Sequence, residues 1–187
     1  MRCAAIDIGS NTTRILVAEP EEGRLKKVME QRDYTRIGKA KDSKGRISRE
    51  KIDEVAEVVE TQVRLAREVG AEAFRAVATA AIRDARKGGD AADAIAARAG
   101  IPVEVVSERE EGRLAFLGAT KALGHPMEGT VAVVDVGGGS TEITTGSVND
   151  GIGLVPGSGH PTGERSTSDI ASKEVPPNSR SPQTLGR

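Results

Sequence analysis

The chain has 187 residues, with 27 lysines and arginines against 28 aspartates and glutamates and a formal net charge of −1. This length suits one large domain or one and a half small ones, and the even charge balance gives no reason to expect nucleic acid or an anionic membrane as a partner. Aromatic residues make up only 2% of the chain, so any core must be built from Val, Ile, Leu and Ala.

The N-terminal region predicts an antiparallel meander. Strands are expected at Cys3–Asp7, Arg14–Glu19 and Leu25–Arg32, with glycine-containing turns between them. Cys3 is the one cysteine of the chain and is expected to be a small buried side chain. Asp7 interrupts the first apolar stretch before a signal peptide can form, and no run approaches the ~20 apolar residues of a membrane span. We therefore expect a soluble, cytoplasmic protein.

The middle of the chain alternates helical and strand patterns. Residues 34–46 are polar and predict a surface loop, and Ser48 is expected to cap a helix that ends at Gly70. The elements expected next are a strand at Phe74–Ala78, a helical turn at Thr79–Ala85, a helix at Asp90–Ala99, a strand at Val103–Ser107 and a helix at Glu108–Leu123. The order β-β-β-α-β-α-α-β predicts a ribonuclease H-like arrangement.

Two stretches combine an apolar run, an aspartate and a glycine turn. Cys3–Asp7 runs into Gly9, Ser10 and Asn11, and the β-branched run within Thr130–Ile143 predicts a buried strand that ends at Asp135. Glycines let backbone N–H groups approach an anion without intervening Cβ atoms. We therefore expect both turns to bind phosphate, and Glu142–Ser147 to return from the second turn as a hairpin. The expected donors of the second turn are Gly137, Gly138, Gly139, Ser140 and Thr141.

Three motifs carry a family resemblance. DIGSNTTR at 7–14, SEREEGR at 107–113 and DVGGGSTE at 135–142 together resemble the exopolyphosphatase / guanosine pentaphosphate phosphohydrolase family, a branch of the actin-like, sugar-kinase and Hsp70 superfamily. Either glycine turn alone would be a weak signal, but the three motifs in this order are specific. The resemblance covers about Met1 to Gly151. It implies that Thr79 and Arg83 lie near the phosphate chain of the substrate and that Glu111 is the catalytic base.

The residues supply the chemistry that phosphoanhydride hydrolysis needs. Asp7, Asp135 and Glu142 are hard oxygen ligands suited to Mg²⁺, and Arg14 can pair with phosphate oxygens, as Arg83 can. Two adjacent glutamates point about 100° apart on a helix, so only one of Glu110 and Glu111 can face a cleft. An acidic first turn favoured by the helix dipole is the structural alternative for both. The sequence contains no motif for a zinc site, for a nucleotide-triphosphatase loop or for a serine triad.

The fold expected from these features is α/β, with a ribonuclease H-like (actin-like ATPase) domain whose mixed sheet is flanked by helices, followed by the start of a second such domain. The expected divisions are 1–124, 125–152, and a Pro- and Ser-rich tail at 153–187 that predicts disorder. Because the resemblance ends at this tail, we expect a truncated or frame-shifted form. Loss of the remaining second domain should expose the Val131–Val134 strand and promote self-association.

The function expected is release of terminal phosphate from inorganic polyphosphate. A guanosine pentaphosphate phosphohydrolase is the close alternative, because both substrates present a terminal phosphoanhydride. An inactive phosphate- or nucleotide-binding fragment is a further alternative, and an actin-like ATPase or sugar kinase fits the EEGR and SNTTR segments less well. Relatives in the family are often dimers, so a homodimer is possible for a full-length form.

Overall fold

The computed structural model describes residues 1–122, 129–138 and 140–146, so the expected disorder at 153–187 and the predicted donor Gly139 lie outside the described residues. The elements, in chain order, are β1 (Arg2–Ile8), β2 (Thr13–Glu21), β3 (Arg24–Asp33), the 3-10 turn η1 (Ile37–Lys39), α1 (Arg49–Glu68), β4 (Ala71–Ala78), α2 (Ala80–Arg83), α3 (Gly88–Ala99), β5 (Val103–Val105), α4 (Glu108–Ala122), β6 (Val131–Val136) and β7 (Thr141–Gly146).

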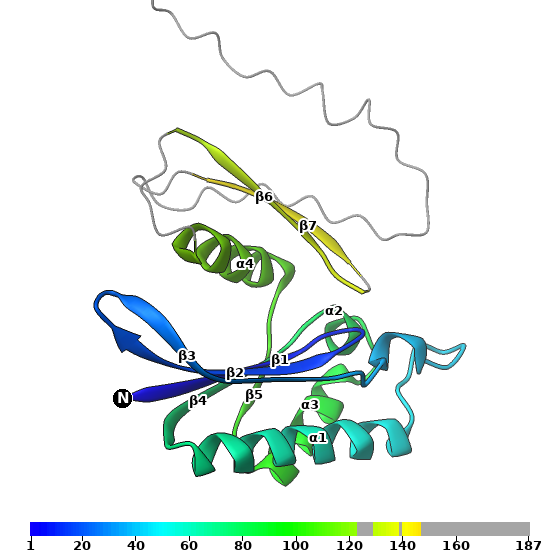
Figure 1. Cartoon of the computed structure of the whole chain (residues 1–187). Helices are drawn as coiled ribbons and strands as arrows, with labels where there is room; N and C mark the ends of the chain where they lie inside the picture. The colour runs from blue at the N-terminus through cyan, green and yellow to red at the C-terminus, as the bar shows by residue number, and fades with distance from the viewer. Residues whose placement is uncertain (123–128, 139, 147–187) are drawn as a thin grey trace, which may run out of the picture.

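The first five strands form one mixed sheet in the order β3-β2-β1-β4-β5. The β1–β2 and β2–β3 pairs are antiparallel, whereas the β1–β4 and β4–β5 pairs are parallel. Helices α1 and α3 cover one face of this sheet, with α1 forming the crossover between β3 and β4 (Figure 1). This architecture confirms the predicted α/β class and its ribonuclease H-like sheet flanked by helices.

The core between the sheet and these helices is aliphatic, as the composition required. Alternate residues of β1, Ala4, Ile6 and Ile8, are buried, and α1 meets them with a stripe that includes Val59 and Val63. Ser48 begins α1 as expected, and its side chain accepts a hydrogen bond from the Lys51 N–H. Residues at odd positions of β1, Asp7 among them, therefore point to the other face of the sheet.

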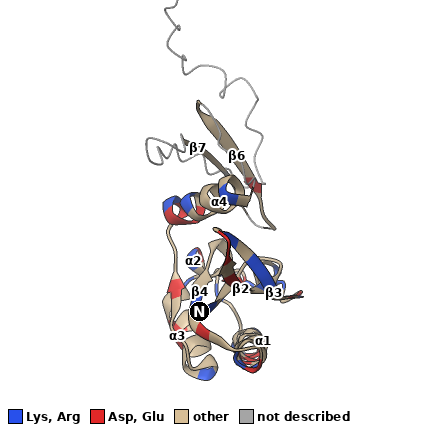
Figure 2. Ribbon diagram, turned by 60° about the vertical axis from the view of Figure 1, so that its left-hand side comes forward, with Lys and Arg blue, Asp and Glu red and all other residues tan. Residues whose placement is uncertain are grey.

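On that other face lie α4 and the antiparallel β6–β7 hairpin, whose return strand was predicted (Figures 1 and 2). Helix α4 packs on this hairpin through Phe116, which is buried. A Cβ added at Gly146 would lie 3.1 Å from Phe116 Cζ, so glycine allows the close approach. The α4 helix and the hairpin thus form a layer of their own.

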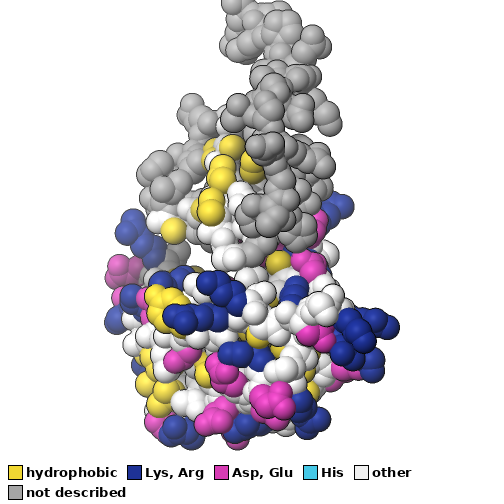
Figure 3. Space-filling view, turned by 90° about the vertical axis from the view of Figure 1, so that its right-hand side faces the viewer, with side chains coloured by type: hydrophobic (Ala, Val, Ile, Leu, Met, Phe, Trp, Pro, Cys, Tyr) yellow, Lys and Arg dark blue, Asp and Glu magenta, His cyan; other side chains and the backbone are white. Residues whose placement is uncertain are grey.

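The structure corrects three sequence-based expectations. The β6 strand is not buried as its apolar run predicts, since Val134 is 58% exposed and Val136 is 74% exposed. The exposure of Val134 agrees with the separate expectation that the Val131–Val134 strand is partly exposed, and Figure 3 shows hydrophobic side chains gathered at the level of the hairpin. Cys3 is exposed, because alternation along β1 gives the core positions to Ala4 and Ile6. The 34–46 segment is not simply a surface loop, since Ile37 within it is buried.

The strand expected at Val103–Ser107 also ends earlier than predicted. β5 stops at Val105, and the Ser107 hydroxyl accepts a hydrogen bond from the Glu110 N–H at 3.2 Å. Ser107 therefore caps α4, because a serine side chain satisfies one of the free N–H groups of a first helical turn. In the described parts of the chain, no helix is long and apolar enough to cross a membrane.

Candidate active site

The first glycine turn joins β1 to β2 and is held from two directions. The Gly9 N–H donates to the Thr12 carbonyl at 2.9 Å, which closes the turn. The segment containing η1 supports the turn from behind, because the Arg36 N–H donates to the Asn11 carbonyl at 3.0 Å and the Gly38 N–H donates to the Ser10 carbonyl at 2.8 Å. The buried Ile37 anchors this supporting segment in the core.

The second turn repeats the geometry of the first. The Gly137 N–H donates to the Ser140 carbonyl at 2.9 Å, again from the first glycine of the turn to the residue three positions later. The two turns also touch: a Cβ built on Gly138 would lie 2.7 Å from the Asn11 Cβ, which real side chains do not tolerate. Glycine at position 138 is therefore what lets the two turns meet.

A pocket of about 560 Å³ lies where the turns meet. Most of the predicted site residues line it: Asp7, Gly9, Ser10, Asn11, Arg14, Glu111, Asp135, Gly137, Gly138 and Ser140. Arg83 and Thr141 are not among its lining residues, and the side chain of Glu142 lies outside the described structure, although the β6–β7 register pairs Glu142 with Asp135. The tertiary structure thus brings the three sequence motifs together at one place.

Glu111 faces this pocket, whereas its neighbour Glu110 does not. Glu110 accepts two hydrogen bonds of 2.7 Å from Arg113 on the same helix, and the Arg113 guanidinium lowers the pKa of the Glu110 carboxyl. Glu111 instead pairs with Arg83, whose Nη1 lies 2.5 Å from Glu111 Oε2. This geometry favours Glu111 over Glu110 for a role in the pocket, and that role stays a prediction.

Arg83 lies behind Glu111 and not on the pocket wall. Its Nη1 also donates to the Val106 carbonyl at 3.3 Å, and its Nε lies 3.4 Å from Asp84 Oδ1. The side chains of Arg83 and Glu111 are 16% and 15% exposed, so this is a largely buried pair. In this arrangement Arg83 Nη1 holds the Glu111 carboxylate, and the phosphate contact expected of Arg83 stays a prediction.

Negative charge accumulates around Asp7. Burial within the recess, reinforced by the nearby Glu111 and Asp135 carboxylates, raises the pKa of Asp7 from 3.8 to about 6, although the Arg14 guanidinium opposes the shift. Asp7 remains accessible to water through the open side of the pocket, so the recess reduces its hydration without sealing it. Crowded carboxylates of this kind attract a cation.

This donor set fits the predicted Mg²⁺. Within the described residues no three Asp, Glu, His or Cys side chains lie close enough together to hold a metal ion. Mg²⁺ usually takes one or two carboxylates and completes its shell with waters and substrate phosphate oxygens, which suits Asp7 and Asp135. The chemistry of the pocket is therefore compatible with Mg²⁺ bound jointly by protein and substrate.

Thr79 lines the same pocket at the start of α2. Its N–H donates to the Ile8 carbonyl at 3.2 Å, and its hydroxyl makes no capping hydrogen bond to the short helix. The structural alternative considered for this residue, an N-cap side chain, is therefore not what the hydroxyl does. That hydroxyl stays available to a ligand in the pocket.

Arg32 and Tyr34, a charged and an aromatic residue that also line the pocket, were not predicted from the sequence. Arg32 lies opposite Arg14 in the β2–β3 register, and Tyr34 follows β3 with 62% of its surface exposed. The pairing of β3 with β2 was predicted, but the exact register that puts Arg32 beside Arg14 cannot be read from a meander pattern.

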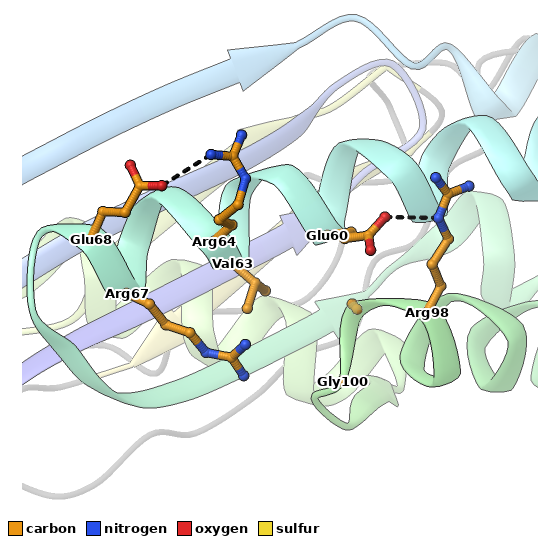
Figure 4. Close-up of a pocket in the computed structure, with 8 residues that line it drawn as sticks. Glu60, Val63, Arg64, Arg67, Glu68, Arg98 and Gly100 are labelled. Atoms are coloured by element: carbon orange, nitrogen blue, oxygen red, sulfur yellow. Dashed lines mark hydrogen bonds and ion pairs between the residues drawn. The ribbon is translucent and has the colours of Figure 1, made fainter.

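A second hollow, of about 620 Å³, lies between α1 and α3 on the opposite face of the sheet (Figure 4). Its charged side chains are largely paired with one another, since Arg98 Nε donates to Glu60 at 2.9 Å and Arg64 Nη1 donates to Glu68 at 3.0 Å. Arg67, which also lines it, lies over the Phe74 ring at 5.5 Å. This hollow is therefore a surface of ion-paired helix side chains, unlike the pocket at the two glycine turns, where carboxylates gather and Asp7 has no such partner among the described residues.

Comparison with known proteins agrees with these motifs. Exopolyphosphatase 1 of Mycobacterium tuberculosis is 30% identical over 147 residues, which are 78% of this chain and 42% of the relative. A crystal structure of the Aquifex aeolicus member of the Ppx/GppA protein family is 36% identical with a TM-score of 0.70, covering 79% of this chain and 47% of the other. An exopolyphosphatase from Cytophaga hutchinsonii has a TM-score of 0.75 at 27% identity, covering 86% and 50%.

The chain spans less than half the length of the curated relatives that it matches. A sequence profile of the Ppx/GppA phosphatase family matches residues 16–156, which include the EEGR segment and the second glycine turn. The profile match, the structural similarity and the meeting of the three motifs in one pocket lead to the same assignment. This chain belongs to the Ppx/GppA phosphatase family.

Proposed function

We propose that this chain carries the catalytic pocket of an exopolyphosphatase, which removes the terminal phosphate from inorganic polyphosphate. The observation that carries the proposal is the contact between the two glycine turns at Gly138 and Asn11, with Glu111 on the wall of the pocket they form. Two turns that meet over one pocket can hold a phosphate from both sides. The names of the similar proteins add support.

The terminal phosphate is held by the turns in this proposal. Backbone N–H groups and the side chains of Ser10, Asn11 and Ser140 donate to its oxygens, and Arg14 pairs with the same chain of phosphates. Phosphoryl transfer depends chiefly on positioning and charge stabilisation. Mg²⁺, held by Asp7 and Asp135, would neutralise charge on the phosphate oxygens when bound.

Glu111 acts on the attacking water. Its carboxylate takes a proton from a water molecule as the water oxygen bonds to the terminal phosphorus, and the bridging P–O bond breaks. The products are orthophosphate and a polyphosphate chain shorter by one phosphate. Arg83 holds the Glu111 carboxylate in place through the ion pair, so the base keeps one orientation.

Guanosine pentaphosphate is the second candidate substrate, because it ends in the same phosphoanhydride. The observation that favours it is Tyr34, an exposed aromatic ring on the pocket wall that could stack on a base. A third possibility is that the chain binds phosphate without turnover, since it spans less than half the length of its relatives.

The experiment is phosphate release from long-chain polyphosphate with Mg²⁺, comparing the chain with its Glu111→Gln and Glu110→Gln variants. We expect Glu111→Gln to reduce release at least a hundredfold, because general-base catalysis contributes typically 10²–10⁴-fold. Glu110→Gln is the matched control on the same helical turn and should keep most of the activity. Equal losses in both variants would remove the assignment of Glu111, and absence of release from the unmodified chain would support binding without turnover.

A further inference from the structure

A row of charged side chains crosses three neighbouring strands on the pocket face of the sheet. The β1–β2 register places Asp7 directly opposite Arg14, and the β2–β3 register places Arg14 directly opposite Arg32. Directly opposite residues on adjacent strands point to the same face. All three residues line the pocket, so the row runs from the carboxylates at its centre towards β3.

The two arginines of this row face each other directly, and Arg14 also faces Asp7 on β1. Like charges directly opposite each other in a sheet are destabilising. Among the described residues, no carboxylate forms an ion pair or a hydrogen bond with Arg14 or Arg32, although Arg2, Arg75 and Arg98 of the same domain all have such partners. Glu30, which lies two positions before Arg32 on the same face of β3, is paired with Lys27 at 2.9 Å.

An anion bound between Arg14 and Arg32 would attract both guanidinium groups and offset the repulsion between them. Guanidinium groups recognise phosphate through charge-assisted, often bidentate hydrogen bonds. Neighbouring strands lie about 4.8 Å apart, so Arg32 begins roughly 10 Å from Asp7, farther than a single phosphate at the turns extends. β3 is also an edge strand of the sheet, so the row ends at an open side.

We propose that Arg32, together with Arg14, binds the phosphates of the substrate that follow the terminal one, so that a linear oligophosphate runs across β2 towards the edge at β3. This inference rests on the proposed function and adds to it a direction for the chain and a residue that selects for length. Inorganic polyphosphate and guanosine pentaphosphate share the required chemistry, a linear run of phosphates. Pyrophosphate is too short to reach Arg32.

The test is a binding measurement that needs no turnover. Affinities for long-chain polyphosphate, guanosine pentaphosphate and pyrophosphate are measured by calorimetry for the unmodified chain, Arg32→Gln and Arg24→Gln. Arg24 is a matched control, because it lies at the other end of the same strand and does not line the pocket. We expect Arg32→Gln to weaken binding of long-chain polyphosphate about five- to tenfold, leaving pyrophosphate within about twofold, since one charge-assisted contact is lost.

Thermal unfolding separates this role from a structural one. Removing one of two facing like charges should leave the Tm of Arg32→Gln equal to or above that of the unmodified chain without ligand, while polyphosphate raises the Tm of the variant less. The affinities for polyphosphate and guanosine pentaphosphate are then compared. The compound whose affinity Arg32→Gln lowers more is the one that binds along the row.

Unchanged polyphosphate affinity in Arg32→Gln would overturn the inference, as would an equal loss for pyrophosphate. Either result combined with normal phosphate release leaves the proposed function standing. Selective loss of polyphosphate binding in a chain that releases no phosphate would support the inference and count against the function. If the unmodified chain binds none of the three compounds, both are wrong.

Discussion

Gly138 in the second glycine turn lies so close to Asn11 in the first that a methyl group on Gly138 would sit 2.7 Å from the Asn11 Cβ. The neighbouring atom is a Cβ next to the backbone and not the end of a flexible side chain. The turn would therefore have to shift as a whole to admit any larger residue. This contact fixes the distance between the two turns and with it the shape of the pocket.

Substitution of Gly138 by alanine is expected to separate the two turns and to weaken phosphate binding. A misplacement of about 1 Å at a catalytic site can cost 10²-fold in rate, so we expect at least a tenfold loss of phosphate release with little change in Tm. Gly118→Ala is the control, because Gly118 lies on the exposed side of α4 with no atom near its missing Cβ. Alanine there should stabilise the helix by up to ~1 kcal/mol without affecting release. Full activity in Gly138→Ala would show that the contact is not needed.

The Arg83–Glu111 ion pair predicts strong coupling between the two residues. Removing Arg83 leaves a largely buried carboxylate without its cation, and we expect Arg83→Gln to lower the free energy of unfolding by about 2 kcal/mol. Urea denaturation of Arg83→Gln, Glu111→Gln and the double variant measures this. The double variant should lose less than the sum of the single losses, because both remove the same interaction.

The kinetic consequence of the same pair separates two roles for Arg83. A residue that orients the base should lower kcat and leave KM nearly unchanged, whereas a residue that holds substrate phosphate should mainly raise KM. We expect Arg83→Gln to reduce kcat at least tenfold and Arg83→Lys to restore part of it. A change confined to KM would return Arg83 to the phosphate-binding role that its sequence position implies.

The raised pKa of Asp7 predicts a defined dependence of stability on pH. The folded state holds the Asp7 proton more tightly than the unfolded state, with a pKa of about 6 against 3.8. The stabilising contribution is therefore complete below about pH 3.8 and is lost as the pH rises through 6. Asp7→Asn cannot ionise, so without divalent cations its Tm should exceed that of the unmodified chain above about pH 6. The difference should shrink as the pH falls towards 4, and parallel Tm curves for the two proteins would contradict the shift.

Tyr34 allows the two candidate substrates to be distinguished. Base stacking on an aromatic ring contributes about 1–3 kcal/mol, and inorganic polyphosphate has no base to stack. Since we favour polyphosphate, we expect Tyr34→Leu to leave phosphate release from polyphosphate within about twofold. Steady-state rates on both substrates provide the measurement. A selective loss on guanosine pentaphosphate, with that compound also the better substrate of the unmodified chain, would reverse the order of the two candidates.

The sequence by itself determined the elements and the motifs. The apolar strand patterns, the Ser48 cap and the position of α1, and the hairpin after the second turn were all readable because each depends on residues close together in the chain. The fold class followed from the order of those elements. The motifs 7–14, 107–113 and 135–142 indicated the family, since their residue types are tied to phosphate chemistry.

Only the tertiary structure decided which of these residues act together. Arg83 pairs with Glu111 across 28 positions in the chain, Arg32 reaches the pocket through strand register, and Cys3 turns away from the core because its neighbours Ala4 and Ile6 fill it. Such relationships depend on long-range packing and on which face of an element is covered, and no local pattern encodes them. The sequence therefore supplied the groups that the proposed hydrolysis needs, and the fold decided which of them meet.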